Sequence, residues 1–210
     1  MHYNFIAIEG NIGAGKTSLA TRIAEEYNAR LILEQFEDNS FLPKFYQDPD
    51  KYAFPLEMSF LAARFQQLKD RLGTQDLFKS FTISDYFIIK SLIFAQKTLA
   101  EDEFNLYTRF FNIIYQQLPK PDLLVYLHLE TSRLQQNIKS RGREYEQQIT
   151  DRYLEKIKEG YFDFIRQRRD MRILLIDTNN IDFVHNPVDY DKLRVAISRK
   201  YPFGVHRLTF

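Results

Sequence analysis

Residues 10–17 form a motif whose backbone and side chains are suited to binding phosphate groups. They read G-N-I-G-A-G-K-T and fit the pattern G-x-x-x-x-G-K-[ST]. The glycines let the backbone bring its N–H groups against an anion, the Lys16 ammonium is expected to meet the β- and γ-phosphates, and the Thr17 hydroxyl is expected to hold Mg²⁺. The predicted nucleotide-binding residues are Gly10, Asn11, Ile12, Gly13, Ala14, Gly15, Lys16, Thr17 and Ser18.

Two carboxylates follow apolar segments that are expected to be strands. Glu34 ends the segment 30–34, and Asp85 directly follows the segment 81–84. The carboxyl ends of the strands in an open parallel sheet line the ligand crevice. Glu34 is therefore expected near the phosphates, with a solvated loop glutamate as the alternative. Asp85 is expected to hold Mg²⁺ together with Thr17, directly or through water.

Two further pairs of charged residues have a spacing that could be functional. Arg141 and Arg143 flank a glycine ahead of another helix, which favours a mobile lid that closes over phosphates because arginine carries a permanent charge and forked donors. A basic turn without that role is the alternative. Glu57 and Arg64 lie about two helical turns apart and share a face, but this spacing by itself indicates only an exposed pair without a function.

The elements that must position these residues follow from the apolar periodicity. Strands are expected at 5–8, 30–34, 81–84, 123–129 and 172–177. Helices are expected from Lys16 onward and at 41–46, 52–72, 87–99, 104–118, 131–140, 153–169 and 189–198. This alternation predicts an α/β layered fold with a parallel sheet of about five strands.

Composition narrows the class of protein. The 210 residues are enough for one domain, and the net charge of +1, from 29 basic and 28 acidic side chains, does not favour a nucleic-acid partner. The chain has no cysteine, so disulfides and thiol catalysis are excluded. No apolar run reaches membrane-spanning length, and the first strand begins almost at Met1, so we expect a cytoplasmic protein without a membrane partner.

Five motifs together resemble those of the deoxynucleoside kinases, in the bacterial branch that includes deoxyguanosine and deoxyadenosine kinases. They lie at residues 9–17, at Glu34 through Glu37-Asp38-Asn39, and at 45–49, 54–58 and 141–143. The resemblance covers nearly the whole chain. It implies a P-loop kinase fold in a single domain over residues 1–210 with an arginine lid at about 141–147. It also implies phosphorylation of the 5′-hydroxyl of a deoxyribonucleoside by ATP with Mg²⁺, and a homodimer built from the helices between strands two and four.

The resemblance also implies roles at the reacting end of the site. Glu34 matches the glutamate that accepts the hydroxyl proton, and Lys16 belongs to the phosphate loop. Arg141 and Arg143 match lid arginines that stabilise the moving phosphoryl group. One departure is that many family members have an arginine directly after the residue that corresponds to Asp85, where this chain has Tyr86. Lys90 is the candidate for the missing cation.

Five further residues are implied to hold the nucleoside. Tyr46 and Glu146 match a pair that grips the sugar 3′-hydroxyl, and Phe94 matches a ring that stacks on the base. Glu57 and Arg64 match the two positions that contact the edge of the base. The resemblance therefore turns the charged pair into a candidate specificity site.

Glu57 stands where many relatives have glutamine, and this difference bears on the base. A glutamine amide offers a donor and an acceptor, whereas a carboxylate offers acceptors only. The Watson–Crick edge of guanine has two adjacent donors, N1–H and N2–H₂, which match a carboxylate, with Arg64 or Lys90 available for O6 and N7. Deoxyguanosine is therefore the expected acceptor, with deoxyinosine tolerated. The alternative is that Arg64 holds Glu57 in a salt bridge, which would allow deoxyadenosine or broad specificity.

Two other classes of protein share the phosphate loop. A nucleoside monophosphate kinase would phosphorylate dGMP rather than deoxyguanosine. A nucleotide-dependent switch would bind a partner without acceptor-dependent ATP turnover. Residues 70–73 spell D-x-x-G, but they end a predicted helix, and no Asn/Thr-Lys-x-Asp motif that would bind guanine follows.

Overall fold

A six-stranded parallel sheet forms the centre of the molecule, in the order β2-β3-β1-β4-β5-β6. The computed structural model describes residues 1–35, 39–74 and 76–210. The strands are β1 (Phe5–Gly10), β2 (Arg30–Ile32), β3 (Thr82–Ser84), β4 (Leu123–His128), β5 (Arg172–Asp177) and β6 (Gly204–Thr209).

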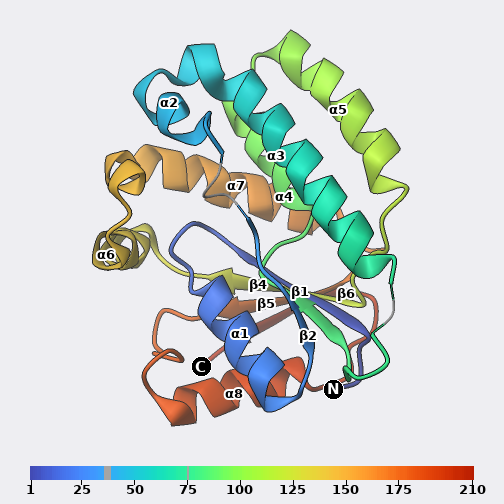
Figure 1. Cartoon of the computed structure of the whole chain (residues 1–210). Helices are drawn as coiled ribbons and strands as arrows, with labels where there is room; N and C mark the ends of the chain where they lie inside the picture. The colour runs from blue at the N-terminus through green and yellow to red at the C-terminus, as the bar shows by residue number, and fades with distance from the viewer. Residues whose placement is uncertain (36–38, 75) are drawn as a thin grey trace.

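Helices cover both faces of this sheet (Figure 1). The helices are α1 (Lys16–Glu26), α2 (Leu42–Gln47), α3 (Pro49–Leu72), α4 (Ile89–Thr98), α5 (Glu101–Tyr115), α6 (Thr131–Arg141), α7 (Asp151–Gln167) and α8 (Pro187–Ile197), with a short 3₁₀ helix, η1, at Glu144–Gln148. In Figure 1, α1 and α8 lie below the sheet, and α3, α4, α5 and α7 lie above it. The α/β layered architecture predicted from the alternation of elements is confirmed.

The two-sided cover explains why the central strands are apolar throughout. In β1, Ile6 and Ile8 pack in the core between the sheet and helices α1 and α8. Phe5 and Ala7 pack in the core between the sheet and helices α3, α4 and α7. Successive side chains of a strand point to opposite faces, so both parities must be apolar when both faces are covered. Burying each large apolar side chain contributes about 1.5–3 kcal/mol.

The register of the sheet brings the carboxyl ends of three strands together. Ala7 of β1 pairs with Ser84 of β3, and Gly10 pairs with Leu127 of β4. Because β2 pairs with β3 through Ile32 and Ser84, the loops after β1, β2 and β3 leave from the same edge of the sheet. The phosphate loop, Glu34 and Asp85 follow those three strands.

Several details differ from the expected elements. Strand β2 ends at Ile32, so Glu34 follows this strand and is not its last residue. The sixth strand, β6, was not expected because its side chains are polar or partly exposed at the edge of the sheet, which leaves little apolar pattern. Residues 101–103, expected between two helices, form the first turn of α5, where carboxylates stabilise the positive end of the helix dipole. Helix α3 begins at Pro49, three residues before the expected start.

Within the described ranges, no helix combines the length and apolar character needed to cross a membrane.

Candidate active site

The phosphate loop requires glycine at two of its positions. Gly13 and Gly15 have φ angles of 84° and 82°, a region that residues with a Cβ rarely adopt. A Cβ on Gly13 would lie 2.8 Å from the carbonyl oxygen of Leu134, and one on Gly15 would lie 2.7 Å from the Phe183 ring. Gly15 is also the N-cap of α1, so the positive end of that helix faces the loop.

Lys16 and Asn11 fix the conformation of this loop. The Lys16 ammonium donates to the carbonyl oxygens of Gly10 and Asn11 at 3.0 and 2.8 Å. Burial lowers the pKa of Lys16 to about 8, and the nearby Lys90 adds to the effect. The Asn11 side chain donates to the carbonyl oxygen of Leu154 at 2.8 Å, which ties the loop to α7. An anionic ligand at this loop would favour the charged form of Lys16.

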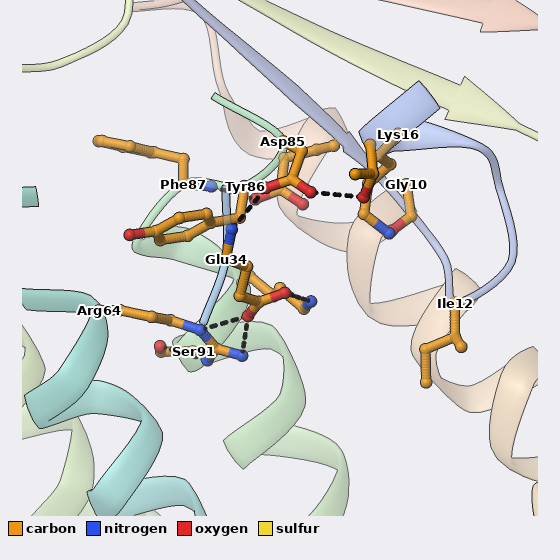
Figure 2. A network of polar contacts seen from close by, with 12 residues as sticks. Gly10, Ile12, Lys16, Glu34, Arg64, Asp85, Tyr86, Phe87 and Ser91 are labelled. Carbon is orange, nitrogen blue, oxygen red and sulfur yellow. Dashed lines mark hydrogen bonds and ion pairs between the residues drawn. The ribbon is translucent and has the colours of Figure 1, made fainter. Parts of the chain in front are cut away.

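Asp85 joins the phosphate loop to the end of β2 (Figure 2). Its Oδ2 accepts a hydrogen bond from the Thr17 hydroxyl at 2.5 Å, and its Oδ1 accepts one from the Glu34 backbone N–H at 2.8 Å. The contact therefore puts a carboxylate and a hydroxyl oxygen side by side at the start of α1. Oxygen ligands of this kind are those that Mg²⁺ prefers.

Glu34 lies between two cations. Its Oε1 accepts from Nε and Nη2 of Arg64 at 2.8 and 2.7 Å, and its Oε2 accepts from Nζ of Lys90 at 2.6 Å. Figure 2 shows Arg64 pointing at Glu34 from α3, with Asp85 on the loop side of Glu34. Burial alone would raise the pKa of Glu34, but Lys90 and Arg64 outweigh it and lower the pKa to about 2. Glu34 is therefore a carboxylate at neutral pH.

Arg64 does not pair with Glu57. Besides Glu34, its guanidinium donates to the Ser91 hydroxyl at 2.7 Å, and no ion pair with Glu57 occurs in the described part of the chain. Glu57 is only 2% exposed, and its Oε1 accepts from the Thr98 hydroxyl at 3.1 Å. Its Oε2 is buried without a hydrogen-bond partner among the described residues. Burial raises the pKa of Glu57 to about 7.

One cavity brings together all the residues expected to hold the acceptor. It encloses about 760 Å³ of empty space, part of it open to solvent. The expected residues that line it are Glu34, Tyr46, Glu57, Arg64, Asp85, Lys90, Phe94 and Glu146, together with Ile12, Gly13, Lys16, Thr17, Arg141 and Arg143. Residues that line it but were not assigned to the site are Leu42, Phe45, Leu56, Phe60, Tyr145 and Tyr153. Leu56 and Phe60 belong to the apolar face of α3, but that face gave no sign that it borders a cavity.

A second cavity of about 1370 Å³, partly open to solvent, also borders the phosphate loop. Residues Gly13, Lys16, Thr17, Arg141 and Arg143 border both cavities. Ala14, Gly15, Ser18 and Thr178 also line the second cavity, whereas Gly10 and Asn11 line neither of the two. Lining residues that were not expected are Leu129, Arg133, Asn137, Ser140 and residues 181–185. The phosphate loop and the two arginines thus lie where the two cavities meet.

The segment at 141–147 is held by one buried carboxylate. Glu146 forms ion pairs with Arg141 and with Arg143, the second through Nη1 at 3.4 Å. The Tyr145 ring stacks on Tyr46, with centroids 6.4 Å apart and planes 18° apart. These contacts hold both arginines in the lining that the two cavities share. Glu37 and Asp38, part of one motif of the resemblance, lie outside the described residues.

Comparisons with known proteins identify relatives along most of the chain. A family model described as deoxynucleoside kinase matches residues 6–200. A deoxyguanosine kinase of Bacillus subtilis (strain 168) is 37% identical over 200 residues, covering 92% of this chain and 95% of that protein. A deoxyadenosine kinase of Dictyostelium discoideum is 31% identical, covering 93% and 78%. A structure of deoxyadenosine kinase from M. mycoides, with the products dCMP and a flexible dCDP bound, has a TM-score of 0.78 at 26% identity, covering 92% and 99%.

Proposed function

The chain belongs to the deoxynucleoside kinase family and is a deoxynucleoside kinase, and we propose that it transfers the γ-phosphoryl group of ATP to the 5′-hydroxyl of deoxyguanosine in preference to other deoxynucleosides. The reaction would take place where the two cavities meet. ATP would occupy the larger cavity, with its phosphates on the loop, and the nucleoside would occupy the cavity that Glu34 and Glu57 line.

In the proposed mechanism Glu34 orients the 5′-hydroxyl and takes its proton. A carboxylate with a pKa of about 2 is a weak base. Phosphoryl transfer passes through a loose transition state, so the hydroxyl proton becomes acidic late, as the new P–O bond forms. Glu34 is then in place to accept it, while Lys90 and Arg64 hold the carboxylate in position.

The cations at the junction stabilise the moving charge. Lys16 would contact the β- and γ-phosphates. Lys90, which donates a hydrogen bond to Glu34, would contact the 5′-oxygen in place of the arginine that many family members have after the residue that matches Asp85. Arg141 and Arg143 would give up part of their ion pairing with Glu146 and contact the γ-phosphoryl group instead. Both belong to the proposed lid at 141–147, within a single domain over residues 1–210. Closing that lid would exclude water, which would otherwise hydrolyse ATP.

We propose that Thr17 and Asp85 hold the Mg²⁺ that accompanies ATP. The fit is supported by the hydrogen bond between their side chains and by the second lone pair that each oxygen keeps available. Bound there, Mg²⁺ would neutralise charge on the phosphate oxygens. The Glu34 backbone N–H fixes the orientation of the Asp85 carboxylate toward Thr17.

The nucleoside would extend from Glu34 toward Glu57. Tyr46 and Glu146, which both line the cavity, would hold the sugar 3′-hydroxyl, and Phe94 would stack on the base. Arg64 would contact the base edge from its place between Glu34 and Ser91.

The unpartnered Oε2 of Glu57 is the observation that carries the choice of guanine. A buried acceptor without a donor is costly, and the N1–H and N2–H₂ groups of guanine would supply two adjacent donors to one carboxylate. Adenine would place its N1 lone pair against the same carboxylate. The mismatch is expected to cost about 1–3 kcal/mol, which corresponds to tenfold to a hundredfold in discrimination.

The test is kcat/KM with Mg·ATP for deoxyguanosine, deoxyadenosine, deoxycytidine and thymidine, in the wild type and in Glu57→Gln. We expect deoxyguanosine to lead in the wild type by at least about tenfold, and the variant to move toward deoxyadenosine because an amide offers a donor and an acceptor. A wild type that prefers deoxyadenosine or a pyrimidine would overturn the guanine assignment. Activity with dGMP in place of deoxyguanosine would instead indicate a nucleoside monophosphate kinase.

We further propose that the enzyme is a cytoplasmic homodimer that contacts its partner through α5. Leu106, Phe110 and Ile113 are 44%, 45% and 61% exposed on one face of this helix. Their spacing of four and three residues forms an apolar stripe. A second copy that covers this stripe would remove it from water, which supports the dimer that the family resemblance implies.

A further inference from the structure

Thr98 donates a hydrogen bond to the Glu57 side chain, although nothing in the proposed mechanism uses this contact. Thr98 ends α4, one turn after Phe94. Its hydroxyl oxygen lies 3.1 Å from Glu57 Oε1 and 2.9 Å from the carbonyl oxygen of Phe94. A hydroxyl has one hydrogen, so it can donate to only one of these acceptors at a time.

These two acceptors correspond to two protonation states of Glu57. When Glu57 is ionised, the Thr98 hydroxyl is drawn to Oε1, because a hydrogen bond to a charged acceptor is the stronger one. When Glu57 carries a proton, its carbonyl-like oxygen is a weaker acceptor, and the hydroxyl can return to the carbonyl of Phe94 at little cost. The hydroxyl therefore favours the carboxylate form.

The other charged and titratable groups near Glu57 do not hold it entirely in one protonation state. Arg64 and Lys90 both form their ion pairs with Glu34, so neither pairs with Glu57 in the described part of the chain. Burial raises the pKa of Glu57 to about 7, against the lowering effects of Arg64, Thr98 and Lys90. The groups that act on Glu57 from the surrounding elements are Glu34, Tyr46, Arg64, Lys90, Tyr107 and Tyr153.

We propose that Thr98 is a specificity-determining residue, which favours the acceptor-only form of Glu57 that pairs with the two donors of guanine. Neutral Glu57 would present one donor and one acceptor, as glutamine does, and would match the N1 and N6–H₂ groups of adenine. Loss of the Thr98 hydroxyl would therefore move the enzyme from deoxyguanosine toward deoxyadenosine. The inference rests on the proposed function, in that Glu57 must contact the base.

A dependence on pH follows from this assignment. The selectivity ratio is kcat/KM for deoxyguanosine divided by kcat/KM for deoxyadenosine. If guanine binds only the ionised form of Glu57 and adenine binds only the protonated form, this ratio rises about tenfold for each unit of increase in pH. Deoxyinosine should follow deoxyguanosine, because it keeps N1–H. Nucleoside binding should therefore be coupled to proton exchange with the solvent. Binding of deoxyguanosine requires Glu57 to lose its proton, and binding of deoxyadenosine requires Glu57 to take one up.

The first experiment measures these protons by titration calorimetry at pH 7, in two buffers that differ in ionisation enthalpy. For a group with a pKa of about 7, deoxyguanosine should release about half a proton and deoxyadenosine should take up about half a proton. Proton exchange of the same sign for both nucleosides, or none for either, would overturn the proposal. Proton release is a readout that does not depend on turnover.

The second experiment compares Thr98→Val with Thr98→Ser. Valine keeps the shape without the hydroxyl, so the selectivity ratio should fall about tenfold at each pH if the pKa of Glu57 rises by one unit. Serine keeps the hydroxyl and should restore the wild-type ratio. Equal losses for both purines in Thr98→Val, which would leave the ratio at its wild-type value at every pH, would show a merely structural role and refute the inference.

The two proposals fail in different ways. If Glu57→Gln leaves the base preference unchanged, Glu57 does not contact the base and the proposed specificity is wrong. If Glu57→Gln shifts the preference but Thr98→Val does not, the base contact stands and the role of Thr98 is wrong. The KM for ATP serves as an internal control, because Thr98 and Glu57 do not line the larger cavity.

Discussion

Replacing Glu34 with glutamine removes a negative charge from the centre of a buried network while keeping the side-chain shape. The Glu34 carboxylate, 9% exposed, holds Lys90 at 2.6 Å and Arg64 at 2.7 Å. A glutamine has one oxygen to accept with, and its NH₂ group would face one of the two cations. Glu34→Gln should therefore affect both stability and turnover, by separate amounts.

The effect on stability follows from the pKa of Glu34. A decrease from 4.5 to about 2 corresponds to roughly 3 kcal/mol in favour of the folded, ionised state. Removing one partner of a buried ion pair costs about 3–5 kcal/mol, so the two figures agree. Because the folded-state pKa is lowered, this stabilisation is complete above pH 4.5 and is lost as the pH falls toward 2. Glu34→Gln should be less stable at pH 7 and should lose less stability on acidification.

The effect on turnover follows from the proposed proton transfer. A positioned general base contributes about a hundredfold to ten-thousandfold in rate, so kcat should fall by that factor while the KM for ATP changes little. Turnover is measured by ADP release with deoxyguanosine, and stability by urea unfolding at pH 7 and pH 3. Glu25→Gln, an exposed carboxylate on α1, is the matched control and should change neither.

Two results would contradict this reasoning independently. If Glu34→Gln keeps kcat within about tenfold of the wild type, Glu34 is not the general base. If the variant is as stable as the wild type at pH 7, the ion pairs of Glu34 with Arg64 and Lys90 do not contribute the stability calculated above. A fall in kcat with unchanged stability would support the catalytic role alone.

Three further predictions concern other parts of the molecule. Asp85→Asn should raise the Mg²⁺ concentration for half-maximal activity by about tenfold to a hundredfold, and an unchanged Mg²⁺ titration would contradict the metal assignment. Glu9→Leu should lower the free energy of unfolding by about 2–6 kcal/mol, because buried Glu9 accepts from the Phe87 N–H at 2.7 Å and the Tyr161 hydroxyl at 2.8 Å. Urea unfolding measures this, and Glu9→Gln, whose amide can serve both partners, should lose less. Phe110→Glu should convert the dimer to monomers in light scattering, whereas a wild type that is already monomeric would refute the α5 interface.

Local spacing was sufficient to predict the frame of the site. The strand, glycine loop and helix over residues 5–26, and the carboxylates that follow β2 and β3, are properties of consecutive residues. Parallel strands then bring those carboxylates to one edge of the sheet, whatever the details of packing. The α/β fold and the nearness of Glu34 and Asp85 to the phosphate loop therefore followed from the amino-acid order, and the structure confirms both.

The pairing of charges inside the cavity was decided by the tertiary structure. Arg64 shares a helix face with Glu57, which suggested a pair, but it contacts Glu34, 30 residues away in the chain. Thr98 reaches Glu57 from another helix, 41 residues away. Periodicity along a helix gives the face on which a side chain lies but not which neighbour lies opposite, because that depends on how α3, α4 and β2 are packed around the cavity. The partners of buried charges are set by that packing, and with them the pKa values on which the chemistry depends.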